Sequence, residues 1–331
     1  MTGQRDPTAD PFRERQRPRY RLRQHLLGAR FEFTSDSAAL LELVASAYRA
    51  LPPQRLRRAP AHCRIHLILG AGPAAAPRIQ PYAAPGLIAG AAQGSSFMAV
   101  NLRTRSALVL VSPALLRHPR LVRYELLEFA AYALAARVQR LVPLHAACVA
   151  SAKGAALLFG HSGAGKSTLV LQALQAGLTF LAEDSVLLEP RSLQAVGVPS
   201  YVHVRADGRR FLRGSSLAAA LGRAPVIVRR SGVRKYELDV RGRGLSLARG
   251  PQPVRALVFL SAQRSRSRTL MHVLPRAQLA RRLRADQPYA AAQRGWPAFL
   301  RAAAQLPAFE LRRGPHPRDV LAALVEVLGK P

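Results

Sequence analysis

Cysteine is almost absent from the 331-residue sequence, which contains only Cys63 and Cys148. Two cysteines provide neither a disulfide framework nor a spaced metal-ligand cluster, and they fit a reducing compartment. No apolar run is long enough to cross a bilayer, because the best candidate, residues 126–149, is interrupted by two arginines and a histidine. The N-terminus is polar and basic and lacks the apolar segment of a secretion signal. We therefore expect a cytoplasmic protein that does not enter a membrane.

Lysine and acidic residues are also scarce. Among 50 basic residues the lysines are Lys153, Lys166, Lys235 and Lys330, and 18 acidic residues leave a formal net charge of +32. Such a charge would suit a nucleic-acid backbone. The arginines are spread from end to end among abundant alanine and proline, which favours a compositional bias over a selected binding patch. Nucleic acid is therefore not the expected partner.

The pattern of apolar residues divides the chain into three parts. Residues 1–20 are rich in arginine and proline and are expected to form a disordered basic tail. Residues 21–140 are expected to form a small α/β N-terminal module, and residues 141–331 a second domain that ends in a helical cap. In the module we predict strands at 20–33 and 62–69, a helix at 37–48, a Gly/Ala/Pro-rich connector, a hairpin at 97–102 and 107–111, and a helix at 121–141. In the second domain, strands are expected at 254–260, 271–274 and 309–311, and helices at 276–284, 296–305 and 317–328.

One stretch of the second domain has a specific motif, because Gly160 to Ser167 match the pattern GxxxxGK[ST]. An apolar strand predicted at 155–159 precedes it, and a helix predicted at 168–176 and ended by Gly177 follows, which is the context of a phosphate-binding loop. Lys166 is expected to reach the β and γ phosphates of ATP, and Ser167 to bind Mg²⁺. The alternative is a glycine-rich turn with a solvated lysine. The residues expected to surround the nucleotide are Gly160, His161, Ser162, Gly163, Ala164, Gly165, Lys166, Ser167 and Thr168.

Two adjacent carboxylates, Glu183 and Asp184, interrupt an apolar strand predicted at 179–188. Acidic side chains in a buried strand are costly unless they bind a cation or a partner. The strand beside a phosphate-binding loop is where magnesium-directing and proton-accepting carboxylates are expected. The alternative is a strand end that emerges into solvent. Upstream, His145 begins a strand predicted at 144–150, where a catalytic and a structural histidine are both compatible with the pattern.

These features together resemble the catalytic domain of the HPr kinase/phosphorylase family over residues 140–245. The histidine before the loop, the loop and the acidic pair carry the resemblance, and residues 238–244 are similar to the family's Glu-x-Arg-Gly-x-Gly segment. The resemblance implies an α/β P-loop kinase domain of HPr-kinase type, with a mixed sheet flanked by helices. It also implies that His145, Lys166, Glu183 and Asp184 surround the transferring phosphate.

The resemblance further implies that Asp184 acts as the base toward a serine hydroxyl and that Asp239 assists magnesium. The metal ligands expected on this basis are Ser167, Glu183 and Asp239. Arg241 is expected to neutralise charge in the transition state, as arginine fingers do.

We therefore predict an ATP- and Mg²⁺-dependent kinase that phosphorylates a serine of a peptide or protein, for example a ribosomal precursor peptide. Two other hypotheses stay open. The first is a kinase of a small-molecule alcohol, and the second is a nucleotide-binding regulatory or assembly protein without phosphotransfer. A homo-oligomer is compatible with each of them.

Overall fold

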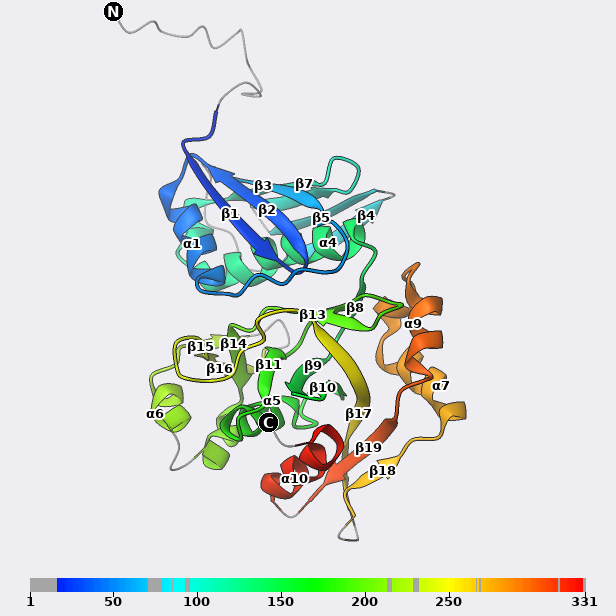
Figure 1. Cartoon of the computed structure of the whole chain (residues 1–331). Coiled ribbons are helices and arrows are strands. Elements are labelled where there is room, and N and C mark those ends of the chain that lie inside the picture. The colour runs from blue at the N-terminus through cyan, green and yellow to red at the C-terminus, as the bar shows by residue number, and fades with distance from the viewer. Residues whose placement is uncertain are drawn as a thin grey trace, which may run out of the picture.

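The computed structural model describes residues 17–70, 79–84, 86–92, 96–212, 216–228, 232–265, 267, 269–314 and 316–329. Residues 1–16, most of the expected basic tail, lie outside this part. The described chain forms two large sheets and one small sheet, with the N-terminal sheet above the others in Figure 1. The expectation of a mixed α/β fold is therefore confirmed.

The N-terminal sheet has seven strands in the order β1-β2-β3-β7-β6-β5-β4. Strands β2, β3 and β7 run parallel to one another, and the other neighbouring pairs are antiparallel. Between β1 and β2, Leu27 and Gly28 have φ values of 52° and 78°, which a two-residue hairpin turn requires. The strands are β1 (Tyr20–Leu26), β2 (Ala29–Ser35), β3 (His62–Leu69), β4 (Ile79–Ala84), β5 (Leu87–Ala92), β6 (Phe97–Asn101) and β7 (Ser106–Val111).

Two helices, α1 (Ala38–Tyr48) and α4 (Phe129–Val138), form one apolar core with this sheet. Alternate residues of β2, such as Phe31 and Phe33, are fully buried in that core, while Arg30 on the opposite face is exposed. The period-two pattern of the strands and the helical spacing of α1 therefore predict this region well.

Two predictions for the N-terminal region are wrong. The Gly/Ala/Pro-rich connector contains β4 and β5, which extend the sheet through backbone pairing of β5 with β6 and of β4 with β5, a pairing that the composition of the segment does not indicate. The single helix expected at 121–141 is divided into α3 (Pro119–Leu121), the π-helix η2 (Val122–Glu128) and α4, and the short helix α2 (Pro113–Leu116) precedes it. π-helical turns occur mostly as short insertions within α-helices, so the apolar pattern of the whole region does not reveal this one.

A nine-stranded mixed sheet organises the rest of the chain around β10 (Gly154–Phe159) and β17 (Gln252–Arg264), which pair in parallel. Every residue of β10 is buried, as expected for a central strand covered on both faces. The remaining strands are β8 (Val142–Leu144), β9 (Ala147–Ser151), β11 (Thr179–Ala182), β12 (Val186–Leu188), β13 (Gln194–Val196), β18 (Met271–Val273) and β19 (Ala308–Arg313).

Helices cover both faces of this sheet, as Figure 1 shows with α7 and α9 beside it and α10 below. Leu158 of β10 packs in one apolar cluster with α5 (Lys166–Gln175) and α10 (Pro317–Leu328). Leu157 packs in the opposite cluster with α7 (Arg276–Asp286), α8 (Pro288–Ala291) and α9 (Trp296–Ala303). None of the described helices is long and apolar enough to span a membrane.

The strand predicted at 144–150 is interrupted at His145. The backbone N–H of His145 donates to Oε1 of Gln287, and its carbonyl accepts from Nε2 of the same side chain, so this residue leaves the ladder. The chain then passes from β8, which pairs with β12, to β9, which pairs with β11. Residues 183–185 likewise connect β11, the partner of β9, to β12, the partner of β8. The two connections therefore cross the same gap between the paired strands, and this brings His145 and Asp184 together.

The small sheet has the antiparallel order β14-β16-β15. Its elements are β14 (Tyr201–Val204), β15 (Val226–Val228) and β16 (Arg234–Asp239), with the 3₁₀ helix η3 (Ala206–Leu212) and α6 (Ser216–Gly222) between β14 and β15. Val202 and Leu238, which are register partners, face the α5 cluster. Their neighbours His203 and Glu237, also partners, lie on the opposite face and contact the N-terminal region.

The N-terminal region packs directly on the rest of the chain. Leu187 of β12 and Val196 of β13 belong to the N-terminal apolar core. Tyr132 of α4 donates to the carbonyl of Ser185, and Oε1 of Gln54 accepts from the backbone N–H of Gly197 at 2.8 Å. The connection that contains Asp184 therefore lies against a helix of the N-terminal region.

Candidate active site

The GxxxxGK[ST] segment forms the turn between β10 and α5, as its sequence predicts. Gly163 and Gly165 have φ values of 84° and 108°, a left-handed conformation that side chains with a β carbon rarely adopt. Lys166 at the start of α5 is buried, and its ammonium group donates to the carbonyl of Gly160 across the loop. His161 and Ser162 at the tip are exposed. The loop therefore presents its tip and the N-terminus of α5 to an incoming anion.

Ser167, in the first turn of α5, contacts the first of the paired carboxylates. Its hydroxyl donates to Oε1 of Glu183 at 2.5 Å. Ser167 is the residue that the motif assigns to magnesium, and Glu183 stands directly after β11. The structure thus brings together two oxygen ligands from segments sixteen residues apart.

Glu183 is almost completely buried, with 5% of its side chain exposed, and His203 of β14 compensates its charge. The Nδ1 atom and the backbone N–H of His203 lie 2.7 and 2.9 Å from Oε2. Burial acts to raise the pKa of Glu183, but the charge and hydrogen bonds of His203 and the bond from Ser167 outweigh it and hold this pKa well below its ordinary value. Glu183 is therefore a fixed carboxylate anion.

Asp184 has a different environment, with 30% of its side chain exposed. Its Oδ1 lies 3.5 Å from Nδ1 of His145, whose own side chain is 57% exposed. Burial lowers the pKa of Lys166, and the negative charges of Asp184 and Glu183 oppose that effect, which places both carboxylates within electrostatic reach of its ammonium group. The predicted set of His145, Lys166, Glu183 and Asp184 is therefore assembled at one place.

Two groups beside the loop have no counterpart in the sequence prediction. The side chain of Asp286, at the end of α7, is 8% exposed and its Oδ1 lies 3.9 Å from Nε2 of His161. Arg313, at the end of β19, donates to the carbonyl of Gly163 at 2.7 Å. An acid at the end of an amphipathic helix and one arginine among many give no local signal, so only the fold identifies them.

His203 links this site to the N-terminal region. Its Nε2 contacts the hydroxyl of Tyr124 in η2 and lies 3.5 Å from Oε2 of Glu237 in β16. The same carboxylate oxygen accepts from Tyr124 and from Arg123, whose side chain is 6% exposed. The sequence analysis missed all four of these residues. For His203 and Glu237 the available signal was alternation in β14 and β16, which places a polar side chain on every second residue.

Asp239 and Arg241, which the motif resemblance assigned to the metal and to the phosphate, have other partners. Both oxygens of Asp239 accept from the Arg241 guanidinium, at 2.9 and 2.7 Å. That guanidinium also donates to the carbonyls of Ser46, Ala47 and Arg49 at the C-terminal end of α1. Cations are favourable at a helix C-terminus, where carbonyls lack partners. This placement gives no support to a role for either residue in the reaction.

The donor atoms beside the loop suit a hard divalent cation. Mg²⁺ prefers oxygen ligands and is usually held by one or two protein groups together with substrate phosphates. The Ser167 hydroxyl and the Glu183 carboxylate supply such oxygens, and the bond between them shows that they reach a common point. Among the described residues no group of three or more His, Cys, Asp or Glu side chains forms a metal cluster by itself. The protein groups therefore fit a magnesium ion that arrives with a nucleotide.

Comparison with known proteins finds a solved structure that resembles part of the chain. The structure of the HPr(Ser) kinase/phosphatase from Coxiella burnetii matches over 56% of this chain and 93% of its own chain, with 12% sequence identity and a TM-score of 0.29. No protein-family model matches the sequence, and no curated protein does. A likeness of this degree does not determine function.

Proposed function

We propose that this protein is an ATP- and Mg²⁺-dependent phosphotransferase that phosphorylates a hydroxyl group, with a serine of a peptide or protein as acceptor. One observation supports it above the others. A phosphate-binding loop stands beside two adjacent carboxylates in contrasting environments, because Glu183 is buried and ion-paired while Asp184 is partly exposed and faces His145. Such a contrast suits two different roles in phosphoryl transfer.

The loop residues hold the nucleotide in this proposal. Backbone N–H groups at the N-terminus of α5 bind the phosphates of ATP, and Lys166 exchanges its bond to the Gly160 carbonyl for the β and γ phosphates. Ser167 and Glu183 hold Mg²⁺, which neutralises phosphate charge when bound. His203 keeps Glu183 ionised and oriented.

Asp184 is the general base. The acceptor oxygen attacks the γ phosphorus while its proton passes to a carboxylate oxygen of Asp184, and the bond between this phosphorus and the β–γ bridging oxygen breaks to release ADP. Partial exposure lets an acceptor reach this carboxylate. His145 orients Asp184 through the 3.5 Å contact and interacts favourably with it when protonated.

A second candidate is a nucleotide-dependent binding protein without phosphotransfer. The contacts of Tyr132 with Ser185 and of Tyr124 with His203 favour it, because they join the N-terminal region to the connection and the histidine beside the nucleotide loop. A protein that signals its nucleotide state to a partner needs such contacts. A small-molecule kinase would use the same loop and carboxylates as the first candidate.

Transfer of labelled γ-phosphate separates these functions. The protein, Lys166→Ala, Asp184→Asn and the control Asp36→Asn would be incubated with Mg²⁺, labelled ATP and size-fractionated extract of the host, and labelled species identified by mass spectrometry. Asp36 is an exposed carboxylate that accepts from the backbone N–H of Arg19. Asp184→Asn should lower transfer by about 100-fold or more while ATP affinity stays within about threefold, whereas Lys166→Ala should weaken both.

Each outcome of this experiment distinguishes between the candidate functions. Labelled serine in a peptide or protein supports the proposed acceptor, and label on a small molecule replaces it. Transfer by Asp184→Asn at the rate of Asp36→Asn would remove Asp184 as the base. Tight ATP binding without a labelled acceptor in any fraction would favour the nucleotide-dependent binding protein.

A further inference from the structure

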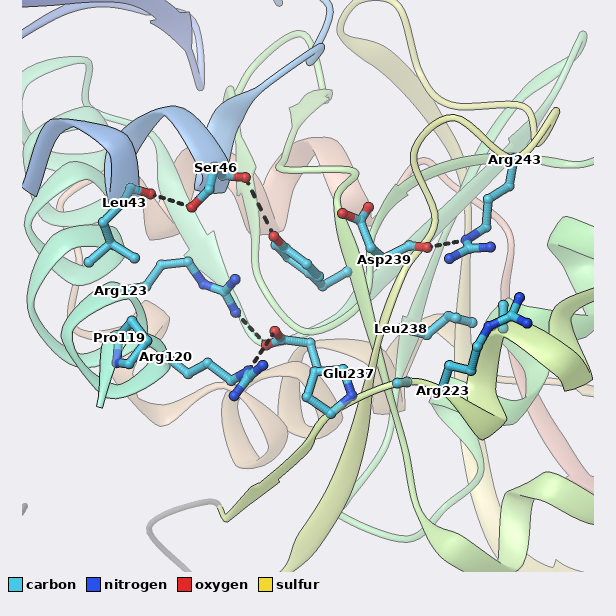
Figure 2. Close-up of a pocket in the computed structure, with 14 residues that line it drawn as sticks. Leu43, Ser46, Pro119, Arg120, Arg123, Arg223, Glu237, Leu238, Asp239 and Arg243 are labelled. Atoms are coloured by element: carbon cyan, nitrogen blue, oxygen red, sulfur yellow. Dashed lines mark hydrogen bonds and ion pairs between the residues drawn. The ribbon is translucent and has the colours of Figure 1, made fainter. Parts of the chain in front are cut away.

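A cavity of about 370 Å³ lies between the N-terminal region and the small sheet. Residues of α1 and of the α3–η2 segment line one wall, and residues of α6, β14 and β16 line the other (Figure 2). No residue of the phosphate-binding loop lines it, so it is separate from the nucleotide site. Its charged lining consists of Arg120, Arg123, Arg223, Glu237, Asp239 and Arg243.

The two carboxylates of this lining already have cationic partners. Asp239 is held by both arms of Arg241, which does not line the cavity. Glu237 accepts from Arg123 on one oxygen, and its other oxygen lies 3.6 Å from Nε of Arg120. Burial acts to raise the pKa of Glu237, but hydrogen bonding by His203, the charge of Arg123 and the bond from Tyr124 lower it to about 2, so this carboxylate is anionic at neutral pH.

Arginines are therefore in excess in the cavity. In the described part of the chain the Arg223 guanidinium makes no hydrogen bond or ion pair, and the Arg243 guanidinium donates to the carbonyl of Asp239, not to a carboxylate. Arg120 is half exposed and shares Glu237 with Arg123. Guanidinium groups without carboxylate partners at the wall of a concave site favour an anionic ligand.

The distribution of the arginines indicates which anion fits. In Figure 2 Arg120 and Arg123 stand on one side of the cavity and Arg223 and Arg243 on the other, so the guanidinium groups do not converge on one point. Apolar groups of Leu43, Pro119 and Pro225 also line the cavity. A compact phosphate would be met by converging donors, whereas separated charges and apolar lining suit a chain that carries several carboxylates.

The cavity is connected to the nucleotide site by direct contacts. Glu237 in its lining contacts His203, His203 bonds to Glu183, and Glu183 bonds to Ser167 of the phosphate-binding loop. Each of these side chains except Ser167 is buried. A ligand in the cavity would thus contact Glu237, which in turn contacts the histidine that supports the proposed metal ligand.

We infer that this cavity binds an acidic peptide segment, with aspartate or glutamate side chains paired to Arg120, Arg223 and Arg243. The inference rests on the proposed function in one respect, since it names the occupant as an acidic segment of the peptide or protein acceptor. Binding in the cavity itself needs neither ATP nor transfer.

The test measures peptide binding in the absence of nucleotide. The probe is a fluorescein-labelled nonapeptide of alternating aspartate and glycine, and an asparagine/glycine peptide is the uncharged reference. Fluorescence anisotropy is measured with the full chain near physiological ionic strength, which screens the general attraction of a protein with a net charge of +32. The cavity variant is Arg223→Glu/Arg243→Glu.

The matched control is Arg281→Glu/Arg284→Glu, on the exposed face of α7, which changes the net charge by the same amount. The cavity variant should weaken binding of the aspartate peptide by about tenfold or more, and the control by less than about twofold. Far-UV circular dichroism checks both folds. If the cavity variant does not fold, Arg223→Gln/Arg243→Gln takes its place, with a smaller but still selective loss.

Equal weakening in the cavity and control variants would show attraction to the basic surface in general and overturn the inference. Displacement of the peptide by inorganic phosphate below about 1 mM would also overturn it, because the site would then bind a compact anion. If the protein binds the aspartate peptide in this cavity but transfers phosphate to no acceptor, the result would count against the proposed function and not against this site.

Discussion

Replacement of Glu237 by glutamine tests whether the buried contact between the N-terminal region and the small sheet stabilises the protein. The Glu237 side chain is 4% exposed, and that of Arg123 is 6% exposed. In Glu237→Gln the amide keeps the shape and can accept from Tyr124, but the negative charge is lost. Among the described residues, Arg123 then retains only Glu128, at 3.3 Å, as an anionic partner. Removal of one member of a buried ion pair leaves a charge without compensation.

The magnitude follows from the pKa of this carboxyl group. A decrease from its ordinary value of 4.5 to about 2 in the folded protein corresponds to about 3 kcal/mol of stability at neutral pH. Breaking a buried ion pair costs about 3 to 5 kcal/mol in general, which agrees. Because the folded pKa is lowered, this stability is complete above the unfolded pKa and is lost as the pH falls through the folded pKa. We therefore expect Glu237→Gln to lower the free energy of unfolding by about 3 kcal/mol at neutral pH.

Urea denaturation followed by far-UV circular dichroism measures this free energy at several pH values. The difference between wild type and Glu237→Gln should shrink by about 1 kcal/mol when the pH falls from about 6 to about 3.5. Glu42→Gln is the matched control, since its pair with Arg49 is exposed and should contribute less than about 1 kcal/mol. A difference below about 0.5 kcal/mol at neutral pH, or one that does not change with pH, would refute the electrostatic argument.

Two further predictions concern the nucleotide site and the cysteines. His203→Ala removes the ring that orients Glu183, so the affinity for Mg²⁺ in the presence of ATP should fall by about 10- to 100-fold, while ATP binding without Mg²⁺ should change little. Isothermal titration calorimetry measures both affinities, and equal losses in the two titrations would contradict the proposed role of His203. Cys63 and Cys148 are buried, and burial raises the pKa of Cys63 to about 11 and raises that of Cys148 further. Neither thiol should react with a chromogenic disulfide reagent at neutral pH until urea unfolds the chain, and rapid reaction in native buffer would show that the core opens.

The parts of the fold that could be predicted from the sequence are those with local signals. The GxxxxGK[ST] motif has a fixed spacing and a fixed strand-loop-helix context, and the strand and the helix are found where expected. Asp184 and His145 could be named because polar residues interrupt apolar strands. Their proximity could not be derived from either segment alone. It depends on the pairing of β8 with β12 and of β9 with β11, which places the two connections next to each other.

The residues that were missed come from segments far apart in the chain. Tyr124, His203 and Glu237 meet across separations of 79 and 113 residues, and each has an ordinary polar identity in its own segment. Tyr124 also lies in a π-helix, where the usual helical spacing does not place its side chain reliably. Sheet register and the docking of the N-terminal region determine this contact. No periodicity within a single segment contains that information.

Strand β16 explains why the segment that contains Asp239 and Arg241 contacts the N-terminal region. Lys235, Glu237 and Asp239 alternate along one face of this strand. The charge of Lys235 acts on Glu183 in the candidate active site, Glu237 contacts His203 and Arg123, and Asp239 orients Arg241 against α1. Successive side chains on this face of the strand therefore contact first the candidate active site and then the N-terminal helix. The N-terminal region and the candidate active site are therefore positioned by the same strand, so their relative placement depends on its register.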